Sequence, residues 1–204
     1  MFCEHRIMIY SIISGFFLGG VVLIIGNVFD NTISVKSKKR VMDKNPELFE
    51  RGQYQVKKNL ILISAPAYSL IYETCINKQL YWLSFQPEKW AAILGIQNLG
   101  YYCAHRIFHT SPKLYRFHHF HHKFDKILIP SIGNSVSTTE YLVAYMAPFA
   151  AGAFMTSPSE LTFVMSLFFV ALLNMSIHCM ELTHLKYPNW LVSPNKHFAH
   201  HIGR

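Results

Sequence analysis

Histidines gather in two stretches of the chain and recur there at helical spacing. The first stretch covers residues 100–123, and the second lies just before the C-terminus. His105 and His109 are four residues apart, so on a helix both imidazoles point to one face, one turn apart. Two further sets have i, i+3, i+4 spacing: His118, His121 and His122, and then His197, His200 and His201. His119 would project about 100° away from His118, and we leave it out of the predicted ligand set.

These three histidine boxes indicate a metal site. Imidazole is a borderline ligand that suits iron, zinc, copper and nickel. A single ion takes about four to six ligands, so eight histidines are too many for one ion and suit a pair. A redox-active pair could activate dioxygen against a C–H bond, whereas zinc would serve hydrolysis or structure. His178 and His184 lie between the second and third boxes and are further candidates.

The elements that must position these boxes are apolar. The chain is 51% hydrophobic and 15% charged, against roughly 25% charged residues in a soluble domain. Apolar runs at residues 7–29, 60–76, 90–103, 137–156 and 161–177 approach the roughly 20 residues that cross a bilayer. We therefore predict an all-α fold, an integral membrane helical bundle with about five apolar spans and a histidine-rich metal-binding cap.

The basic residues predict the orientation of this bundle. Lys and Arg fall in segments 30–59, 105–136 and 178–204, and only Arg6, Lys78 and Lys89 lie elsewhere. Cytoplasmic segments carry the excess of Lys and Arg, so the same side that holds the three boxes is predicted to face the cytoplasm. No aromatic residues alternate with the basic run that follows the first apolar segment, so we expect no nucleic-acid partner despite the net charge of +8. We divide the chain into an N-terminal membrane anchor with a basic cytoplasmic linker (1–59) and a membrane domain (60–204).

The boxes as they stand resemble a known family. The sequences His105-Arg-Ile-Phe-His109, His118-His-Phe-His121-His122 and His197-Phe-Ala-His200-His201 resemble those of the fatty acid hydroxylase/sterol desaturase superfamily in type, order and separation. The apolar hairpin between the second and third boxes is also similar. The resemblance covers residues 90–201, a little over half of the chain.

The resemblance implies an endoplasmic reticulum membrane enzyme of lipid biosynthesis, an iron-dependent oxidoreductase. Such enzymes use two iron ions, for which zinc can stand in on isolation, and dioxygen as co-substrate to hydroxylate or desaturate a fatty acyl or sterol lipid. A reductase and a b-type cytochrome supply the electrons. The family commonly has one more histidine between the last span and the final box, and His184 matches it best. The implied metal ligands are His105, His109, His118, His121, His122, His184, His197, His200 and His201, with His178 as an additional candidate.

Two departures from the family pattern keep an alternative open. Only Glu140 remains of the His-Pro-x-Glu sequence that family members often carry near the start of the fourth span, and the chain ends three residues after His201, where members usually continue. From this we expect a C-terminally shortened chain. The alternative is a non-catalytic or degenerate membrane protein of the same fold that binds metal or lipid.

Overall fold

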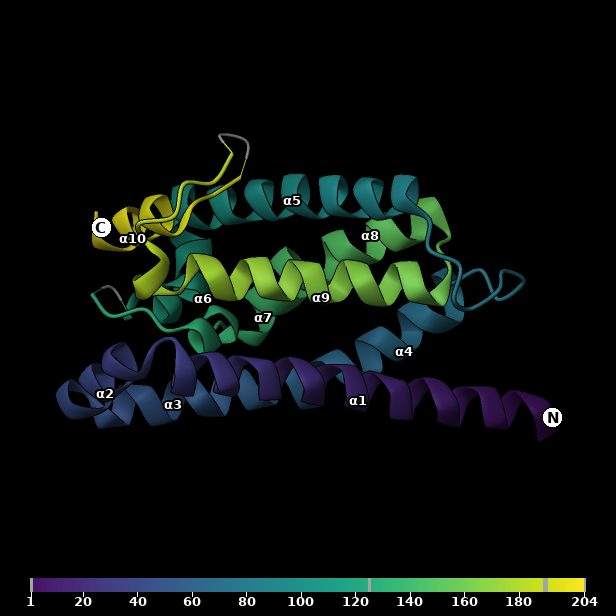
Figure 1. The fold of residues 1–204 in the computed structure, drawn as a ribbon, viewed down its shortest axis with the longest axis horizontal. Helices are drawn as coiled ribbons and strands as arrows, with labels where there is room; N and C mark the ends of the chain where they lie inside the picture. Colours follow the sequence, from purple (N-terminus) through teal and green to yellow (C-terminus); the bar gives the residue numbers. More distant parts are fainter. Residues whose placement is uncertain (1, 125, 189–190, 204) are drawn as a thin grey trace.

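The regular structure of the chain is helical. The computed structural model describes residues 2–124, 126–188 and 191–203, with side chains from Ile9 onward, and every regular element in these residues is a helix. This confirms the all-α class. The long helices run along the long axis of the molecule, and the short helices α2, α3, α6 and α10 lie toward the end opposite the N-terminus (Figure 1).

Two helices in the described part are long and apolar enough to cross a membrane. One lies within α1 (Phe2–Thr32) and covers Ile9–Thr32, and the other is α9 (Glu160–Ile177). Both coincide with runs that the sequence marks as spans. The other three predicted spans form helices that do not meet the same criterion, so a count of five spans stays a prediction.

The N-terminal part is more regular than its composition suggests. The basic stretch after α1 forms two helices, α2 (Val35–Lys44) and α3 (Pro46–Lys57), followed by a π-helical segment (Lys58–Ile63) and α4 (Ser64–Cys75). Helix α1 packs closely on this returning segment. A Cβ at Gly15 would collide with the carbonyl oxygen of Ala65, and one at Gly19 with that of Leu60. The two glycines therefore set how near the helices lie, as in small-x-x-x-small contacts.

The remaining helices surround the histidines. Helix α5 (Pro87–Thr110) is followed by α6 (Pro112–His122), a 3₁₀ turn (Pro130–Asn134), α7 (Thr138–Glu140), a π-helical segment (Tyr141–Met146) and α8 (Ala147–Thr156). A tight turn with Ser157 at φ 44° leads into α9, whose first turn is capped by Ser159. A short 3₁₀ turn (Met180–Leu182) precedes the last helix, α10 (Pro194–Ile202).

The segment after the second histidine box lies outside the predicted apolar spans, yet much of it is buried. Leu128, Ile129 and Ile132 are buried and pack with Val41 and Phe124 in a small hydrophobic cluster. Removal of these side chains from water stabilises the segment beneath α2 and α3. The stretch thus ties the basic N-terminal helices to the histidine end of the molecule.

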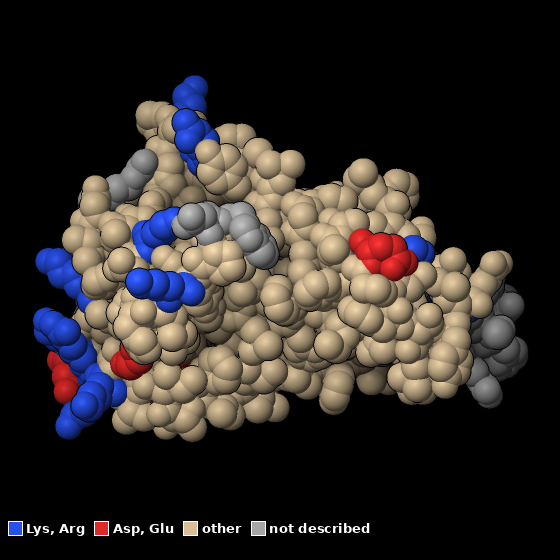
Figure 2. Space-filling view, turned by 45° about the horizontal axis from the view of Figure 1, so that its top comes forward, with Lys and Arg blue, Asp and Glu red and all other residues tan. Residues whose placement is uncertain are grey.

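Charged side chains are unevenly distributed. On the face seen in Figure 2, Lys and Arg gather toward the end that carries the short helices, and most of the remaining surface is uncharged. This distribution fits a molecule that exposes one charged end to water and has an apolar body. The two apolar helices and this surface indicate membrane association.

Candidate metal centre

Four segments bring the histidines together. His105 and His109 lie in the last two turns of α5, which ends at Thr110 because Ser111-Pro112 starts a new helix. Proline is favoured at the first helical position, where its missing N–H costs nothing. The second box lies on α6, His178 is the residue that follows α9, and the third box lies on α10. Ser193 caps α10 by accepting a hydrogen bond from the N–H of Lys196.

The first histidine group joins α5, α6 and α10. His105, His109, His118 and His200 each offer one ring nitrogen, and these atoms lie within 4.8 Å of one another. The Nε2 atoms of His105 and His200 are 3.1 Å apart. A residue from the final helix thus completes a set that begins 95 positions earlier in the chain.

The second group joins α6, α10 and the end of α9. His121, His178, His197 and His201 are all buried, and their ligand atoms also lie within 4.8 Å of one another. The Nε2 atom of His178 is 3.1 Å from that of His121 and 2.9 Å from that of His197. The Nε2 atoms of His197 and His201 are 3.1 Å apart.

His122 lies between the two groups. Its Nε2 is 2.9 Å from that of His118 and 3.3 Å from that of His109. Its ring also stacks on that of His201, with the centroids 4.5 Å apart. His122 can therefore serve the first group while it packs against the second.

His184, which the family resemblance implies as a metal ligand, lies outside both histidine groups. It is exposed, and the position between the last span and the final box is filled by His178. The physical reason lies in Glu181, whose carboxylate accepts hydrogen bonds of 2.7 Å from Ser34 and Ser37 and so holds this segment against α2. His119, which the spacing left out, is exposed.

Two hydrogen bonds fix the orientation of imidazoles in the groups. The Nδ1–H of His118 donates to the carboxylate of Glu140 over 2.6 Å, and both side chains are fully buried. The Nδ1–H of His178 donates to the backbone carbonyl of Asn174, also over 2.6 Å. Each bond leaves the Nε2 lone pair directed into its group, as is usual for metal-binding histidines. Glu140 is the residue that remains of the His-Pro-x-Glu sequence noted above.

The imidazoles are held in their neutral form. Burial, assisted by His109 and His200 nearby, lowers the pKa of His105 to about 2. Burial also lowers the pKa of His178 to about 4 and the pKa of His121 and of His197 well below its ordinary value. A neutral imidazole is the form that ligates a metal. At neutral pH the two groups therefore offer neutral imidazole nitrogens with free lone pairs. Neither group includes an acidic side chain.

The spacing of these donors fits metal ions. Two nitrogens bound to one ion at about 2.1 Å lie about 3.0 Å apart at a right angle and about 3.4 Å apart at the tetrahedral angle. The Nε2 atoms of hydrogen-bonded histidine pairs within the two groups, and of His122 with the first group, are 2.9 to 3.3 Å apart. The two four-histidine groups can therefore each hold a metal ion.

A cavity opens beside both groups. It has a volume of about 530 Å³, and its wall includes His105 and His200 from the first group and His197 from the second. Much of the remaining wall is apolar, with Leu173 and Ile177 from α9 among its residues. A volume of several hundred Å³ suits a small-molecule or lipid ligand. The arrangement places such a ligand in contact with the metal-binding side chains.

The sequence interpretation missed two polar residues in this wall, Gln97 and Tyr101. Both lie on α5 at intervals of four residues from His105, so they share its helix face. The ring of Tyr101 stacks on that of His105 with the centroids 5.3 Å apart. The four-residue interval that leads into the first box was the signal that could have identified them.

Comparison with known proteins shows which family shares this histidine-rich region. The family model described as fatty acid hydroxylase matches residues 90–204, more than half of the chain and all of the histidines described above. Neither the curated proteins nor the solved structures give a significant match. The family match, together with the order of the three boxes, shows that this chain belongs to the fatty acid hydroxylase family.

Proposed function

We propose that this protein is a membrane lipid oxygenase that hydroxylates or desaturates a fatty acyl or sterol substrate with two iron ions and dioxygen. The observation that carries the proposal is the contact of both histidine groups with one largely apolar cavity. A metal-binding scaffold needs no such cavity, whereas an oxygenase must place an apolar chain against its metal site.

The chain supplies the ligands and their orientation. The first ion would be held by His105, His109, His118, His122 and His200, and the second by His121, His178, His197 and His201. Glu140 and the carbonyl of Asn174 keep the imidazoles of His118 and His178 in the ligating tautomer. When bound, the iron pair supplies the activation of dioxygen that attack on an unactivated C–H bond requires.

The cavity performs the remaining task, which is positioning. Its apolar wall binds the hydrocarbon part of the lipid and excludes bulk water, and its histidine edge holds one carbon of the lipid next to the ions. Electrons come from a reductase and a b-type cytochrome at the basic end of the molecule. That end faces the cytoplasm from the endoplasmic reticulum membrane, and the product enters lipid biosynthesis.

Untargeted lipid profiling tests this function. Cells that express the wild-type protein are compared with cells that express His121→Ala, and His119→Ala, the same change at an exposed residue of the same helix, serves as the control. We expect a hydroxylated or desaturated lipid in the wild-type and His119→Ala cells and its absence in the His121→Ala cells. Identical lipid profiles in all three would overturn the proposal and favour the non-catalytic alternative.

A further inference from the structure

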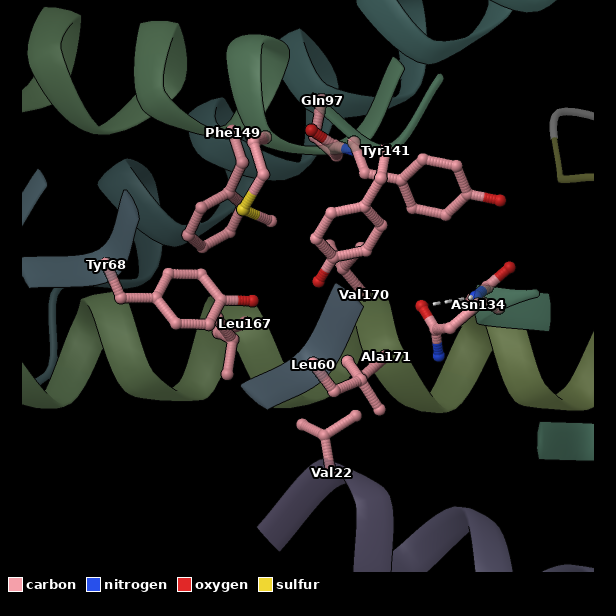
Figure 3. A pocket seen from close by; sticks show the side chains of 13 residues that line it. Val22, Leu60, Tyr68, Gln97, Asn134, Tyr141, Phe149, Leu167, Val170 and Ala171 are labelled. Atoms are coloured by element: carbon pink, nitrogen blue, oxygen red, sulfur yellow. Dashed lines mark hydrogen bonds between the residues drawn. The ribbon is translucent and has the colours of Figure 1, made fainter. Parts of the chain in front are cut away.

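The wall of the large cavity has an unusual polar region deep in the helical body. A second, smaller cavity of about 40 Å³ lies behind it, and the two share Gln97, Tyr145, Val170 and Asn174 as a common wall. Figure 3 shows the smaller cavity from close by, with Gln97 at its edge near Tyr141. Three of the four shared residues are polar, although most of the surrounding side chains are apolar.

Gln97 is the shared residue that is left without a protein partner. It is 4% exposed, and its Oε1 accepts no hydrogen bond from the described residues. By contrast, Tyr145 donates to the carbonyl of Gly133, and Asn174 donates to Asn134. A buried amide oxygen without a partner costs about 1–3 kcal/mol, and polar groups inside a membrane bundle commonly mark functional sites. The side chain is thus available to a ligand.

Tyr101 adds a second hydrogen-bonding group one turn further along α5. Its hydroxyl is buried and pairs with that of Tyr145, while its ring is held between those of His105 and Tyr145. Gln97 and Tyr101 are about 6 Å apart along the helix axis, close to two hydrogen-bond lengths. The unpartnered Oε1 of Gln97 requires a hydrogen-bond donor, whereas the hydroxyl of Tyr101 can both donate and accept. A hydroxyl group of a ligand can donate to Gln97 and accept from Tyr101, so it complements both side chains.

The charge of the wall excludes an anionic group at this position. Among the described lining residues, Lys196 is the one Lys, Arg, Asp or Glu side chain, and it stands next to His197 on α10. A carboxylate or phosphate beside Gln97 would be buried with no cation, which is strongly unfavourable. A neutral hydroxyl meets no such penalty.

We propose that the inner end of the large cavity, formed by Gln97 and Tyr101, binds a neutral hydroxyl group of the lipid substrate. This inference rests on the proposed function, which it narrows from fatty acyl or sterol lipids to those that carry a free hydroxyl. Eight residues separate Gln97 from His105, or about 12 Å along the helix axis. The carbon that reacts is therefore remote from the hydroxyl that binds, with the apolar part of the lipid between them.

The test compares three long-chain ligands that differ in one group. Equilibrium binding of tritiated octadecanol to the purified full-length protein is measured in competition with unlabelled octadecanol, its methyl ether and stearate. The ether has the same chain but cannot donate a hydrogen bond, and stearate is anionic. We expect octadecanol to bind about tenfold more tightly than the ether, the effect of one satisfied buried hydrogen bond, with stearate no tighter than the ether.

Substitutions test whether Gln97 and Tyr101 cause the preference for the alcohol over the ether. Gln97→Leu and, separately, Tyr101→Phe should remove most of the preference for the alcohol, and the second keeps the ring that packs on His105. Gln79→Leu is the control: it makes the same Gln-to-Leu change at an exposed loop residue, and it should keep the preference for octadecanol over its ether. Leu173→Trp fills the cavity and should weaken the binding of all three ligands.

These binding measurements test the proposal without a measurement of enzyme activity. Equal affinity of octadecanol and its ether for the wild-type protein would overturn it, since water would then satisfy both side chains. Tightest binding of stearate, or an unchanged preference in both Gln97→Leu and Tyr101→Phe, would overturn it as well. Failure of the oxygenase function is recognised separately, by the absence of an oxidised lipid in cells. Either result can occur without the other.

Discussion

At the scale of single residues, the metal centre depends on which nitrogen of each imidazole is free. The bond from His118 to Glu140 and the bond from His178 to the carbonyl of Asn174 settle this for one member of each group. Both partners are remote in sequence or belong to the backbone. The ligand set is therefore a property of neighbouring segments as well as of the histidine boxes themselves.

The location of His178 and His184 leads to a first prediction. His178 is buried with its Nε2 near two other ligand atoms, and His184 is exposed outside both groups. We expect His178→Ala to lose the metal of the second group and His184→Ala to retain it. Metal content of the purified variants, measured by mass spectrometry against protein concentration, checks this. Equal metal loss in the two variants would contradict the geometry.

Glu140 gives a second prediction. Replacement by glutamine keeps the size of the side chain but exchanges the carboxyl group that holds the Nδ1 atom of His118 for an amide, so we expect metal affinity to fall about 10- to 100-fold. Competition with a chelator measures the change. Glu160→Gln is the matched control, because Glu160 accepts from Tyr72 at the other end of the molecule. Unaltered affinity in Glu140→Gln would show that this hydrogen bond does not support the site.

At the scale of elements, the close approach of α1 to the segment that includes α4 is set by glycine. A Cβ at Gly19 would meet the carbonyl oxygen of Leu60, which belongs to the backbone and cannot move alone, whereas one at Gly20 meets nothing within 4 Å. In a helix, alanine is ordinarily about 1 kcal/mol more favourable than glycine. The two neighbouring glycines should therefore respond in opposite directions.

This contrast is the third prediction. We expect Gly19→Ala to lower the free energy of unfolding by about 1–3 kcal/mol through overpacking, and Gly20→Ala to keep or raise it. Thermal unfolding of the detergent-solubilised protein, followed by circular dichroism, measures both. A loss of stability of the same size in the two variants would mean that the helices do not pack through Gly19.

The elements also show how far sequence reasoning reaches. Helical spacing was enough to place His105 with His109, because this relation is local. It did not reveal that the boxes on α6 and α10 are each divided between the two groups, with His118 and His200 in the first group and His121, His197 and His201 in the second. It could not decide between His178 and His184, since that choice depends on the anchoring of Glu181 to Ser34 and Ser37, more than 140 residues away. The four-residue intervals from Gln97 to His105 place both residues on one helix face, but they do not reveal that the amide oxygen of Gln97 lacks a partner, because that depends on tertiary packing. The apolar runs correctly predicted helices, but burial of Ile129 and Ile132 depends on tertiary packing.

At the scale of the whole molecule, α6 and α10, which carry most of the grouped histidines, lie toward one end, and most of the Lys and Arg side chains on the face seen in Figure 2 gather at the same end (Figures 1 and 2). The positive-inside rule predicts that this end faces the cytoplasm. A fourth prediction follows for orientation in the endoplasmic reticulum membrane. A glycosylation acceptor inserted after Lys78 should be modified in the lumen, and the same acceptor inserted after Lys44 should not be. Modification at the second position alone would reverse the topology.

The two histidine groups lead to the central claim of the account, which is that one chain holds two metal ions. The most direct measurement is the iron content of the wild-type protein, purified from iron-supplemented cells, beside variants that disable one group at a time. We predict about two iron atoms per chain in the wild type and about one in either His109→Ala/His200→Ala or His197→Ala/His201→Ala, since each four-histidine group provides the ligand number that one ion needs. A wild-type protein that binds one ion or none, or a single double variant that loses both ions together while the protein stays folded, would contradict the assignment of two independent sites.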